Sequence, residues 1–314
     1  MRILLFGASG FLGRHIRARL AAEATVRAPD RQEFDLVGAD EAAVTALLRR
    51  EQPDAVVNAA GRIVGSDQEF LLAHAVVTAK LVAAMEAATP QARLVRVGSA
   101  AEYGRVEPGR PVREDDRAEP VGGYGLSHLT ATRLGAFAAA EGRLDTVVLR
   151  VFNPLGPGMP AGNLIGRAAA TVRAALERGD TQVALGLHDT YRDFVDVRDV
   201  SAAVWAALRA ERLDARVCNV GSGRSVPTAQ VVRLLADLAG FTGDLVPGRF
   251  VPGAARSAAV PWMCADLARS ARVLGWSPRY DLADSLASVW ADCRAAGRAV
   301  GFSGAKPSPV VTGP

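Results

Sequence analysis

Cysteine is scarce in this 314-residue chain, and the three cysteines present, Cys218, Cys264 and Cys293, are far apart and odd in number. None of them has the Cys-x-x-Cys spacing of a structural zinc site, and an odd number cannot close a complete set of disulfides. The composition therefore excludes a disulfide-rich fold and a zinc-finger fold. It is typical of a protein from a reducing compartment.

Long apolar runs and blocks of like charge are also absent from the sequence. No run of about 18 apolar residues occurs, and the N-terminal run "RILLF" ends in a glycine turn. Lys+Arg 37 against Asp+Glu 33 leaves a net charge of +4, with the basic residues interspersed among the acidic ones. We therefore expect a soluble cytoplasmic protein that has neither a membrane nor a nucleic acid as its partner.

Strand-like and helix-like segments alternate along the first half of the chain. The runs "RILLF", "DAVVNAA", "RLVRVGS" and "DTVVLRVF" are β-branched or leucine-rich. Between them lie alanine-rich segments with helical periodicity, at 40–51, 69–88 and 126–142. This alternation predicts an α/β fold with a doubly wound parallel sheet and right-handed crossovers.

The composition of the sequence changes after Phe152. The Gly/Pro loop "NPLGPGMPAGN" and a predicted helix at 164–178 begin a second region. The later segments "RDFVDVRDVSAAVWAAL" and "ARVCNVG" have the pattern of a return to the sheet. The final residues are rich in Pro, Gly and Ser, which favours disorder. The expected units are 1–152 with about 193–220, a smaller C-terminal unit of 153–192 with 221–302, and a disordered tail at 303–314.

A glycine-rich turn follows the first predicted strand. In "GASGFLG", three glycines are spaced three residues apart, and the predicted helix "RHIRARLAAE" comes next. Glycine lets the backbone turn sharply and approach a pyrophosphate, which the N–H groups at the helix N-terminus stabilise. The order of strand, turn and helix predicts a dinucleotide site. The residues expected to contact the dinucleotide are Gly7, Ser9, Gly10, Phe11, Leu12 and Gly13.

The second predicted strand, at about 24–29, ends at Asp30 and Arg31. An acid at this point accepts a hydrogen bond from the ribose of NAD, whereas an arginine holds the 2′-phosphate of NADP. Since both residue types are present, the sequence predicts NAD or NADP and does not separate them. Further residues expected to line this cofactor are Asp35, Leu36, Ala59, Ala60 and Gly61.

A serine, a tyrosine and a histidine form the predicted catalytic group. Ser99 ends the strand "RLVRVGS", and Tyr124 lies 25 residues later in a predicted helix, one turn before His128. In a doubly wound sheet such residues meet at the carboxyl edge of the strands. A phenol can move a proton to or from an oxygen as hydride moves at the adjacent carbon, if a nearby cation favours its ionised form. The serine hydroxyl can fix the substrate oxygen.

With these motifs the chain resembles the extended short-chain dehydrogenase/reductase superfamily, in its NAD-dependent epimerase/dehydratase family. The matching segments are "GASGFLG", "GSAAEYG", "YGLSH", "LRVFNPLGPG", "RDFVDVRDV", "NVGSG" and "LGWSP", which cover essentially residues 1–295 in the family's order. The resemblance implies a Rossmann domain, a smaller C-terminal substrate domain, and a homodimer formed through helices that include the one carrying Tyr124. It also implies a nucleotide sugar as substrate.

One residue departs from the family pattern, since His128 stands where Tyr-x-x-x-Lys places a lysine that binds the nicotinamide ribose and supplies positive charge. Histidine is charged only part of the time at neutral pH. Three interpretations compete: a working catalyst with a pH-sensitive cation, an enzyme whose proton comes from elsewhere, and a cofactor-binding protein without redox activity. Ser99 and Tyr124 favour the first. If His128 must be protonated, turnover should fall above the imidazole pKa.

The residues after Ser99 bear on the type of reaction. Ala100 and Ala101 stand where sugar dehydratases of the family carry an acid, which disfavours a 4,6-dehydratase. Glu102 is expected to turn toward solvent or a local partner. Similarity to 4-keto-6-deoxyhexose reductases favours 4-keto reduction with Tyr124 as the acid/base. The alternatives are a nucleotide-sugar 4-epimerase with tightly bound NAD, a ketoreductase of a non-sugar secondary metabolite, and a non-catalytic NAD(P)-binding protein.

For the substrate, the resemblance assigns Asn153 to the sugar or first phosphate and suggests Arg192 and Arg256 as further contacts. An arginine suits phosphate because its planar fork makes two charge-assisted hydrogen bonds. His74 and His188 have no metal-ligand spacing, so we expect them to be structural and expect no metal site.

Overall fold

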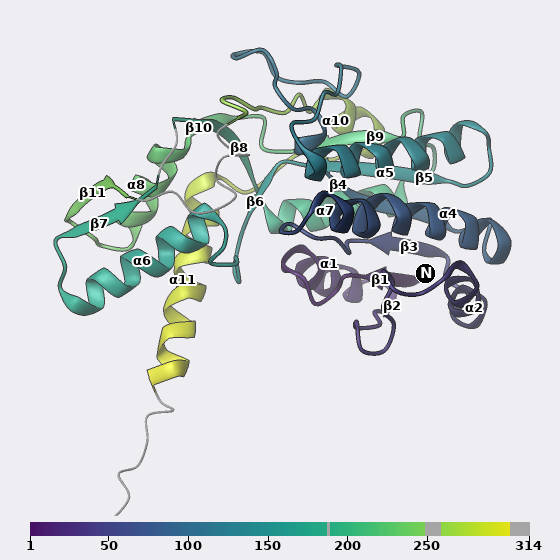
Figure 1. Ribbon diagram of the computed structural model, residues 1–314, viewed down its shortest axis with the longest axis horizontal. Coiled ribbons are helices and arrows are strands. Elements are labelled where there is room, and N and C mark those ends of the chain that lie inside the picture. The colour runs from purple at the N-terminus through teal and green to yellow at the C-terminus, as the bar shows by residue number, and fades with distance from the viewer. Residues whose placement is uncertain (187–188, 249–258, 302–314) are drawn as a thin grey trace, which may run out of the picture.

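The computed structural model describes residues 1–186, 189–248 and 259–301, and its larger part is built around a parallel sheet (Figure 1). Within the described residues this sheet has six strands in the order β2-β1-β3-β4-β5-β9, and every neighbouring pair is parallel. The α/β fold class predicted from the sequence is confirmed. The strands are β1 (Arg2–Phe6), β2 (Thr25–Arg27), β3 (Ala55–Asn58), β4 (Arg93–Ser99), β5 (Thr146–Val151) and β9 (Val217–Val220).

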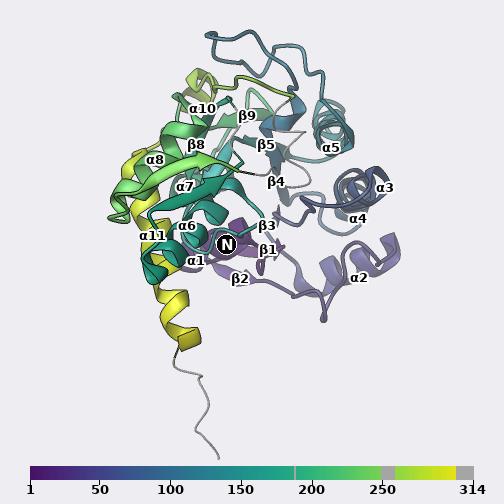
Figure 2. The same cartoon turned by 60° about the vertical axis from the view of Figure 1, so that its left-hand side comes forward.

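Helices cover both faces of the sheet, as Figure 2 shows. Helices α1 (Phe11–Ala21) and α7 (Val197–Arg209) pack together on one face. Helices α2 (Glu41–Glu51), α4 (Val77–Ala88) and α5 (Gly123–Ala140) lie on the other. Strand β1 lies between β2 and β3, so the chain continues from β1 to one side of it and then returns to the other. The turn after β1 therefore lies at the crevice where such sheets bind ligands.

The alternation of side chains along β1 explains the two-layered core. Ile3 and Leu5 face α1 and α7, whereas Leu4 and Phe6 face α2 and α4, and all four are at most 2% exposed. Successive side chains on a strand point to opposite faces, so a strand covered on both faces must be apolar throughout.

A π turn interrupts the long helical stretch from 67 to 88. The stretch consists of α3 (Asp67–Leu71), the π turn η1 (Leu72–Val76) and then α4. Helix α3 begins with a capping box between Ser66 and Glu69. By length and composition this stretch could cross a membrane, but core helices of soluble proteins pass the same test. Here it packs against α2 and α5. Single π turns often occur at functional sites.

The smaller region has its own core. Strand β8 (Tyr191–Asp196) pairs with β6 (Asn153–Leu155) and β10 (Ser225–Pro227), and β7 (Gln182–Leu185) pairs with β11 (Asp244–Pro247). Helices α6 (Leu164–Arg178), α8 (Thr228–Leu238) and α11 (Leu282–Gly301) cover them, while α10 (Ala268–Leu274) packs against β9 and α7. The segment expected to rejoin the large sheet as a strand, β8, therefore lies outside it. The return begins only at α7.

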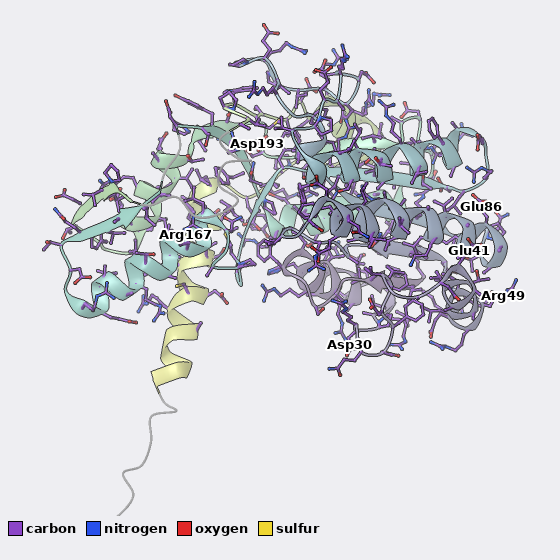
Figure 3. All side chains as sticks on the ribbon, viewed as in Figure 1. Asp30, Glu41, Arg49, Glu86, Arg167 and Asp193 are labelled. Atoms are coloured by element: carbon purple, nitrogen blue, oxygen red, sulfur yellow. The ribbon has the colours of Figure 1, made fainter. Side chains whose placement is uncertain are left out.

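A buried carboxylate holds the second half of the chain together. Asp193, labelled in Figure 3, lies on β8 and accepts backbone hydrogen bonds from Ser222 at 2.6 Å, Gly223 at 3.0 Å and Ala265 at 3.0 Å. Burial raises its pKa and these hydrogen bonds lower it. The loop that follows β9 is fixed to β8 by this one side chain.

Candidate active site

The glycine turn after β1 is closely packed. Gly7 has a φ of +80°, which favours glycine, and a Cβ added there would lie 2.5 Å from the Ala60 nitrogen. At Gly13 an added Cβ would lie 1.9 Å from the Gly7 carbonyl oxygen. The turn therefore has α1 directly behind it and the Ala59–Ala60 turn beside it. These two predicted cofactor-binding segments are brought together.

Helix α1 presents its N-terminal N–H groups at this turn. Its N-cap residue is Gly10, which has no side chain to cap them, and both Ser9 and Gly10 are exposed. Phe11 and Leu12 are half-buried in the first turn. The backbone is thus free to receive an anion such as a pyrophosphate.

Asp30 and Arg31 are exposed at the end of β2. The Asp30 carboxylate accepts hydrogen bonds from the backbone N–H groups of Gln32 at 2.8 Å and Glu33 at 2.9 Å. Arg31 lies 3.5 Å from the Asp35 carboxylate. Since the acid and the arginine share one surface loop, the geometry suits the ribose of NAD and the 2′-phosphate of NADP alike.

The other residues predicted near the adenine are held by the fold. Leu36 is buried in the core beside α2 and α4. Lys80 on α4 donates hydrogen bonds to the carbonyls of Leu36 at 3.0 Å and Val37 at 2.9 Å. Leu36 therefore supports the loop from within, whereas the neighbouring Asp35 is half-buried.

Ser99 ends β4 and caps the short 3-10 turn η2 (Ala100–Glu102). Its hydroxyl accepts a hydrogen bond from Ala101 N–H at 3.2 Å. A Cβ added at Gly125 would lie 2.4 Å from the Ala101 carbonyl oxygen, so the start of α5 packs on this turn. Ser99 and the helix carrying Tyr124 are thereby adjacent, although they are far apart in sequence.

Glu102 does not face solvent. It is fully buried, its carboxylate accepts from Arg150 Nε at 2.8 Å and from the Ser99 N–H at 3.2 Å, and it lies 4.0 Å from Arg96. The expectation of a turn toward solvent was wrong, and the expected local partner is the Ser99 N–H. The charged partner, Arg150, is 48 residues away on β5. The Arg150 guanidinium also lies over the Tyr103 ring at 4.5 Å.

Three aromatic rings surround that of Tyr124. Its ring centroid lies 4.8 Å from that of His128, 5.5 Å from that of Phe70 and 5.7 Å from that of His74. The two histidine rings are 4.0 Å apart. The spacing of four residues on α5 does place Tyr124 and His128 on one face, as the sequence suggested, and the π turn adds His74 to them.

His74 links three segments of the site. Its Nε2 accepts from the backbone N–H of Arg62 at 3.1 Å, so Nδ1 carries the proton and donates to the Ser127 hydroxyl at 2.8 Å. That hydroxyl donates to the Tyr124 carbonyl at 2.8 Å. The pKa of His74 is lowered to about 4 by burial and by Arg96. His74 was expected to be merely structural, yet it joins the turn after β3 to the helix of the predicted catalytic tyrosine.

His128 is almost fully buried, and Arg96 on β4 donates from Nη2 to its Nδ1 at 3.0 Å. Burial first, then the charge of Arg96 and then His74, hold the pKa of His128 well below its ordinary value. This environment disfavours the protonated His128 that was expected as a pH-sensitive cation. A charged imidazole here would face a guanidinium in a buried site.

The predicted substrate residues lie on the strands of the smaller region. Asn153 begins β6 and donates to the Asp193 carbonyl at 2.7 Å. Arg192 on β8 is buried, donates to the carbonyls of Tyr191 at 2.7 Å and Val260 at 2.6 Å, and has its pKa lowered to about 10 by burial. Arg256, like His188, lies outside the described residues.

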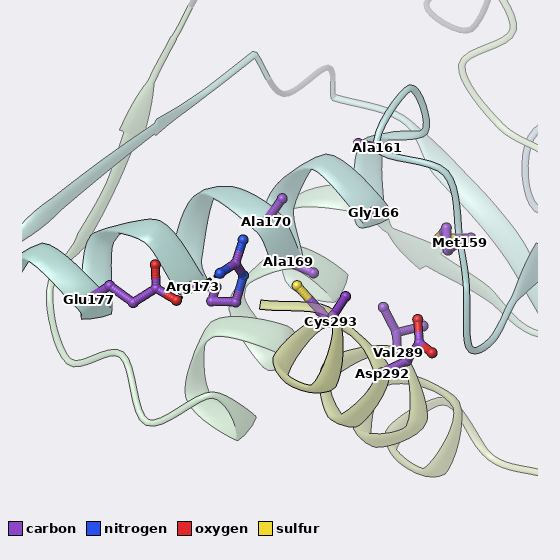
Figure 4. A pocket seen from close by; sticks show the side chains of 11 residues that line it. Met159, Ala161, Gly166, Ala169, Ala170, Arg173, Glu177, Val289, Asp292 and Cys293 are labelled. Carbon is purple, nitrogen blue, oxygen red and sulfur yellow. Dashed lines mark hydrogen bonds and ion pairs between the residues drawn. The ribbon is translucent and has the colours of Figure 1, made fainter. Parts of the chain in front are cut away.

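A separate hollow of about 630 Å³ lies between α6 and α11 (Figure 4). Met159, Arg173, Asp292 and Cys293 are among its lining residues, and none of the predicted site residues is. Among the described residues no group of His, Cys, Asp and Glu could hold a metal ion. Cys218 and Cys264 are buried and have their pKa raised to about 12, mainly by burial.

Sequence reasoning missed Arg96. The signal was present, because the strand "RLVRVGS" carries an arginine among apolar residues at the centre of a sheet, where a buried charge requires a partner. Arg150 in "TVVLRV" gives the same signal, and Glu102 is the acid shared by the two.

Comparisons with known proteins agree with this geometry. The model of the NAD dependent epimerase/dehydratase family matches residues 3–221. The chain is 37% identical to dTDP-6-deoxy-L-talose 4-dehydrogenase (NAD(P)(+)) of Kitasatospora kifunensis, over 92% of this chain and 94% of that one. It is 30% identical to GDP-6-deoxy-D-mannose reductase of Pseudomonas aeruginosa, over 93% and 96% of the two chains.

Among solved structures, RMD from Pseudomonas aeruginosa complexed with NADPH superposes with a TM-score of 0.82 at 27% identity, over 94% of this chain and 99% of that one. A UDP-glucose 4-epimerase from Thermotoga maritima, at 22% identity and a TM-score of 0.81 over 94% and 99% of the two chains, shares the fold. With the family model matching most of its length, this chain belongs to the NAD-dependent epimerase/dehydratase family.

Proposed function

We propose that this protein is an NAD(P)-dependent oxidoreductase of nucleotide-activated sugars, and that its reaction is reduction of a 4-keto group with Tyr124 as the acid/base. The observation that carries the proposal is the position of Tyr124. Its helix begins on the turn capped by Ser99, and its ring packs against His128 at the edge of the sheet where β4 ends. This packing supports a site in which the Tyr124 phenol and the Ser99 hydroxyl act together at the ligand-binding crevice.

The residues present fit a dinucleotide. Gly7, Gly10 and Gly13 allow close approach of the pyrophosphate, and Asp30 and Arg31 lie at the end of β2 where the ribose is recognised. A bound nicotinamide would supply the hydride. We take the cofactor to be NAD or NADP, because the relatives named above use both or bind NADPH.

The side chains of this chain would do the remaining work. Ser99 would hold the carbonyl oxygen of the substrate by a hydrogen bond, and the Tyr124 hydroxyl would deliver a proton to that oxygen as it becomes an alcohol. His128 would donate a hydrogen bond from Nε2, its Nδ1 being occupied by Arg96. We assign Asn153, Arg192 and Arg256 to the substrate side, since the first two lie on neighbouring strands of the smaller region.

Reduction is favoured over epimerisation by the relatives that are 37% and 30% identical, whose names describe a 4-dehydrogenase and a reductase. A 4-epimerase remains the second candidate, since a relative named UDP-glucose 4-epimerase matches at 28% identity over 91% of this chain. An epimerase would retain NAD through purification, and a reductase would exchange it.

A direct assay tests the proposal. Purified protein is mixed with NAD⁺ or NADP⁺ and either dTDP-6-deoxy-L-talose or GDP-6-deoxy-D-mannose, and reduced nicotinamide is followed by absorbance. We expect oxidation of one sugar and loss of at least about 100-fold in rate for Tyr124→Phe. Cofactor binding without any change in redox state with both sugars, together with no epimerisation of UDP-glucose, would leave only a binding protein.

The family resemblance also leads us to propose a homodimer in the cytoplasm. Leu126 and Phe137 on α5 are 50% and 59% exposed, and Leu72 and Val76 on η1 are exposed beside them, which forms an apolar face suited to a second copy. Light scattering should give twice the monomer mass. Phe137→Glu should give a monomer, whereas Leu238→Glu on α8 should leave the dimer intact.

A further inference from the structure

A buried guanidinium lies directly behind the predicted catalytic pair. Arg96 is in the middle of β4 and only 3% exposed. Its Nη2 donates to His128 Nδ1 at 3.0 Å, its Nη1 donates to the Thr132 hydroxyl at 3.3 Å, and Glu102 lies 4.0 Å away. Among the described residues, the hydrogen bonds and the ion pair of this side chain are thus to α5 and to the turn that follows Ser99.

The contact with Arg96 fixes the tautomer of His128. A guanidinium has donors and no acceptor, so Nδ1 must be the unprotonated nitrogen and Nε2 must carry the hydrogen. Within the described part of the chain this is the one hydrogen bond that His128 makes, which leaves the Nε2–H group available to a ligand. His74 is held in the opposite tautomer by Arg62 and Ser127.

The buried charged groups around Arg96 and His128 carry a net positive charge. Glu102 is much closer to Arg150, at 2.8 Å, than to Arg96, at 4.0 Å. Two guanidiniums against one carboxylate give a net charge of +1, with the surplus nearer Arg96. Burial lowers the pKa of Arg96, and the Glu102 carboxylate and the Tyr124 phenol act in the opposite direction, so the charges of Arg96 and Tyr124 influence each other in a buried setting where screening is weak.

We propose that Arg96 is the fixed cation of this active site, and that it orients a neutral His128 whose Nε2–H group donates to the bound cofactor. The two side chains together would then replace the single lysine of Tyr-x-x-x-Lys. Arg96 supplies the charge that stabilises the phenolate of Tyr124, and His128 supplies the hydrogen bond. Arg96 is a positioning residue, and its role rests on the proposed function of Tyr124.

The groups that face His128 all favour this division of roles. Arg96 approaches it from β4, His74 from η1, and Tyr124 from one turn away on α5. A proton on His128 would place two positive charges 3.0 Å apart in a buried site. A neutral imidazole accepts from Arg96 at no such cost.

Nuclear magnetic resonance of the protein without cofactor tests the pair independently of activity. With ¹⁵N-labelled histidine the four histidines give four pairs of imidazole nitrogen signals, and the His128 pair is assigned by its loss in His128→Lys. We expect an Nε2–H tautomer for His128 that does not titrate between pH 6 and pH 9, and an Nδ1–H tautomer for His74. An Nδ1–H tautomer at His128, or titration of its ring near pH 6.5, overturns the proposal.

Two substitutions of similar size separate the charge of Arg96 from its hydrogen bond. Arg96→Lys keeps a cation, whereas Arg96→Gln keeps a donor without charge. In the direction of alcohol oxidation, where the ionised Tyr124 phenol accepts the proton, we expect Arg96→Gln to raise the apparent pKa of the pH–rate profile by about one unit, which lowers the rate about tenfold at a fixed pH below that pKa. Arg96→Lys should leave the profile near its original position. Equal profiles for both variants would show a purely structural role.

A rescue experiment completes the test. His128→Lys alone should lose at least about tenfold in activity and unfold at lower denaturant, because its ammonium meets Arg96. Adding Arg96→Met should restore most of both losses. Arg93→Met is the matched control, since Arg93 is on the same strand but is paired with Asp145. Full activity of His128→Lys alone, or equal rescue by both methionine variants, contradicts the proposal.

These outcomes remain distinguishable from failure of the proposed function. If Tyr124→Phe is fully active, the proposed function fails, while the tautomer and the rescue of stability are still measurable without substrate. If Tyr124→Phe is inactive but His128 titrates near pH 6.5, the function stands and the role of Arg96 falls.

Discussion

The His74 ring lies 2.8 Å from the Ser127 hydroxyl and so connects a π turn to the helix of Tyr124. The same ring accepts from the backbone of Arg62, beyond the turn formed by Ala59 to Gly61. A predicted wall of the cofactor site and the predicted acid/base are therefore held by one side chain. His74 should affect both stability and cofactor binding.

His74→Phe should retain the stacking on Phe70 but lose both hydrogen bonds. We expect a loss of about 2 kcal/mol in the free energy of unfolding, because the buried Ser127 hydroxyl and the partly buried N–H of Arg62 each lose their hydrogen bond with His74. The affinity for NAD(P) should fall severalfold as the Ala59–Gly61 turn loosens. Urea unfolding and calorimetric titration measure the two effects. Ser127→Ala breaks one link only and should cost less, and unchanged cofactor affinity in His74→Phe would contradict the connection.

Acid should destabilise the protein through its buried histidines. The pKa of His74 is lowered from 6.5 to about 4 in the folded state, so below pH 6.5 the unfolded chain binds a proton that the folded chain does not. Stability is therefore complete above pH 6.5 and is lost as the pH falls toward about 4, by about 2 kcal/mol for His74 between pH 7 and pH 5. His128 adds to this loss in the same direction.

Denaturant unfolding at pH 7, 6 and 5 measures how steeply the free energy of unfolding falls with pH, and this dependence is the slope compared below. His74→Gln should reduce the slope relative to the unaltered chain. His15→Gln is the control, because His15 is half-buried on α1 and contacts only the Pro157 carbonyl and the Phe11 ring among the described residues. An equal slope in His74→Gln would show that the acid sensitivity arises elsewhere.

Glu102→Gln should be strongly destabilising. The substitution leaves the guanidiniums of Arg150 and Arg96 buried without their shared carboxylate. Breaking a buried ion pair from one side typically costs about 3 kcal/mol or more. Chemical denaturation gives the value. Glu119→Gln removes an exposed partner of Arg117 and should change stability by less than about 1 kcal/mol, so similar losses for both would refute the buried role of Glu102.

Gly13→Ala should disrupt the glycine turn after β1 directly, because the new methyl group would lie 1.9 Å from the Gly7 carbonyl oxygen. We expect NAD(P) affinity to fall by at least about tenfold, since the backbone that approaches the pyrophosphate is displaced. Gly162→Ala is the matched control, because nothing lies within 4 Å of a Cβ at that position. Fluorescence titration of both variants decides the point, and unaltered affinity in Gly13→Ala would remove this turn from the cofactor site.

The features that the sequence predicted well depend on neighbours in the chain. The turn with Gly7 and Gly13 follows a strand and precedes a helix, and the four-residue spacing of Tyr124 and His128 fixes their shared face once α5 forms. The helices at 41–51 and 164–178 also appear close to the expected positions. In each case local pattern and final structure agree because the deciding contacts lie within a few residues.

The features that could not be predicted depend on distant contacts. Glu102 is buried because Arg150, on the neighbouring strand, provides a partner for it. Strand β8 has the pattern of a central strand but pairs with β6 and β10, since alternation alone does not specify which sheet a strand joins. His74 enters the site only because a π turn shifts its direction on the helix. The local sequence indicates that Arg150 needs a buried partner, but it does not identify Glu102 as that partner, the sheet that β8 joins or the position of His74.

The contacts of Arg96 with His128 and Thr132 have a consequence for how the crevice responds to a ligand. A lysine on a helix has a flexible four-carbon stem and can reorient as a cofactor enters. A planar guanidinium clamped on a central strand cannot follow a ligand in this way. The electrostatic field at the Tyr124 hydroxyl is therefore set during folding, and little reorganisation would be needed when a substrate arrives.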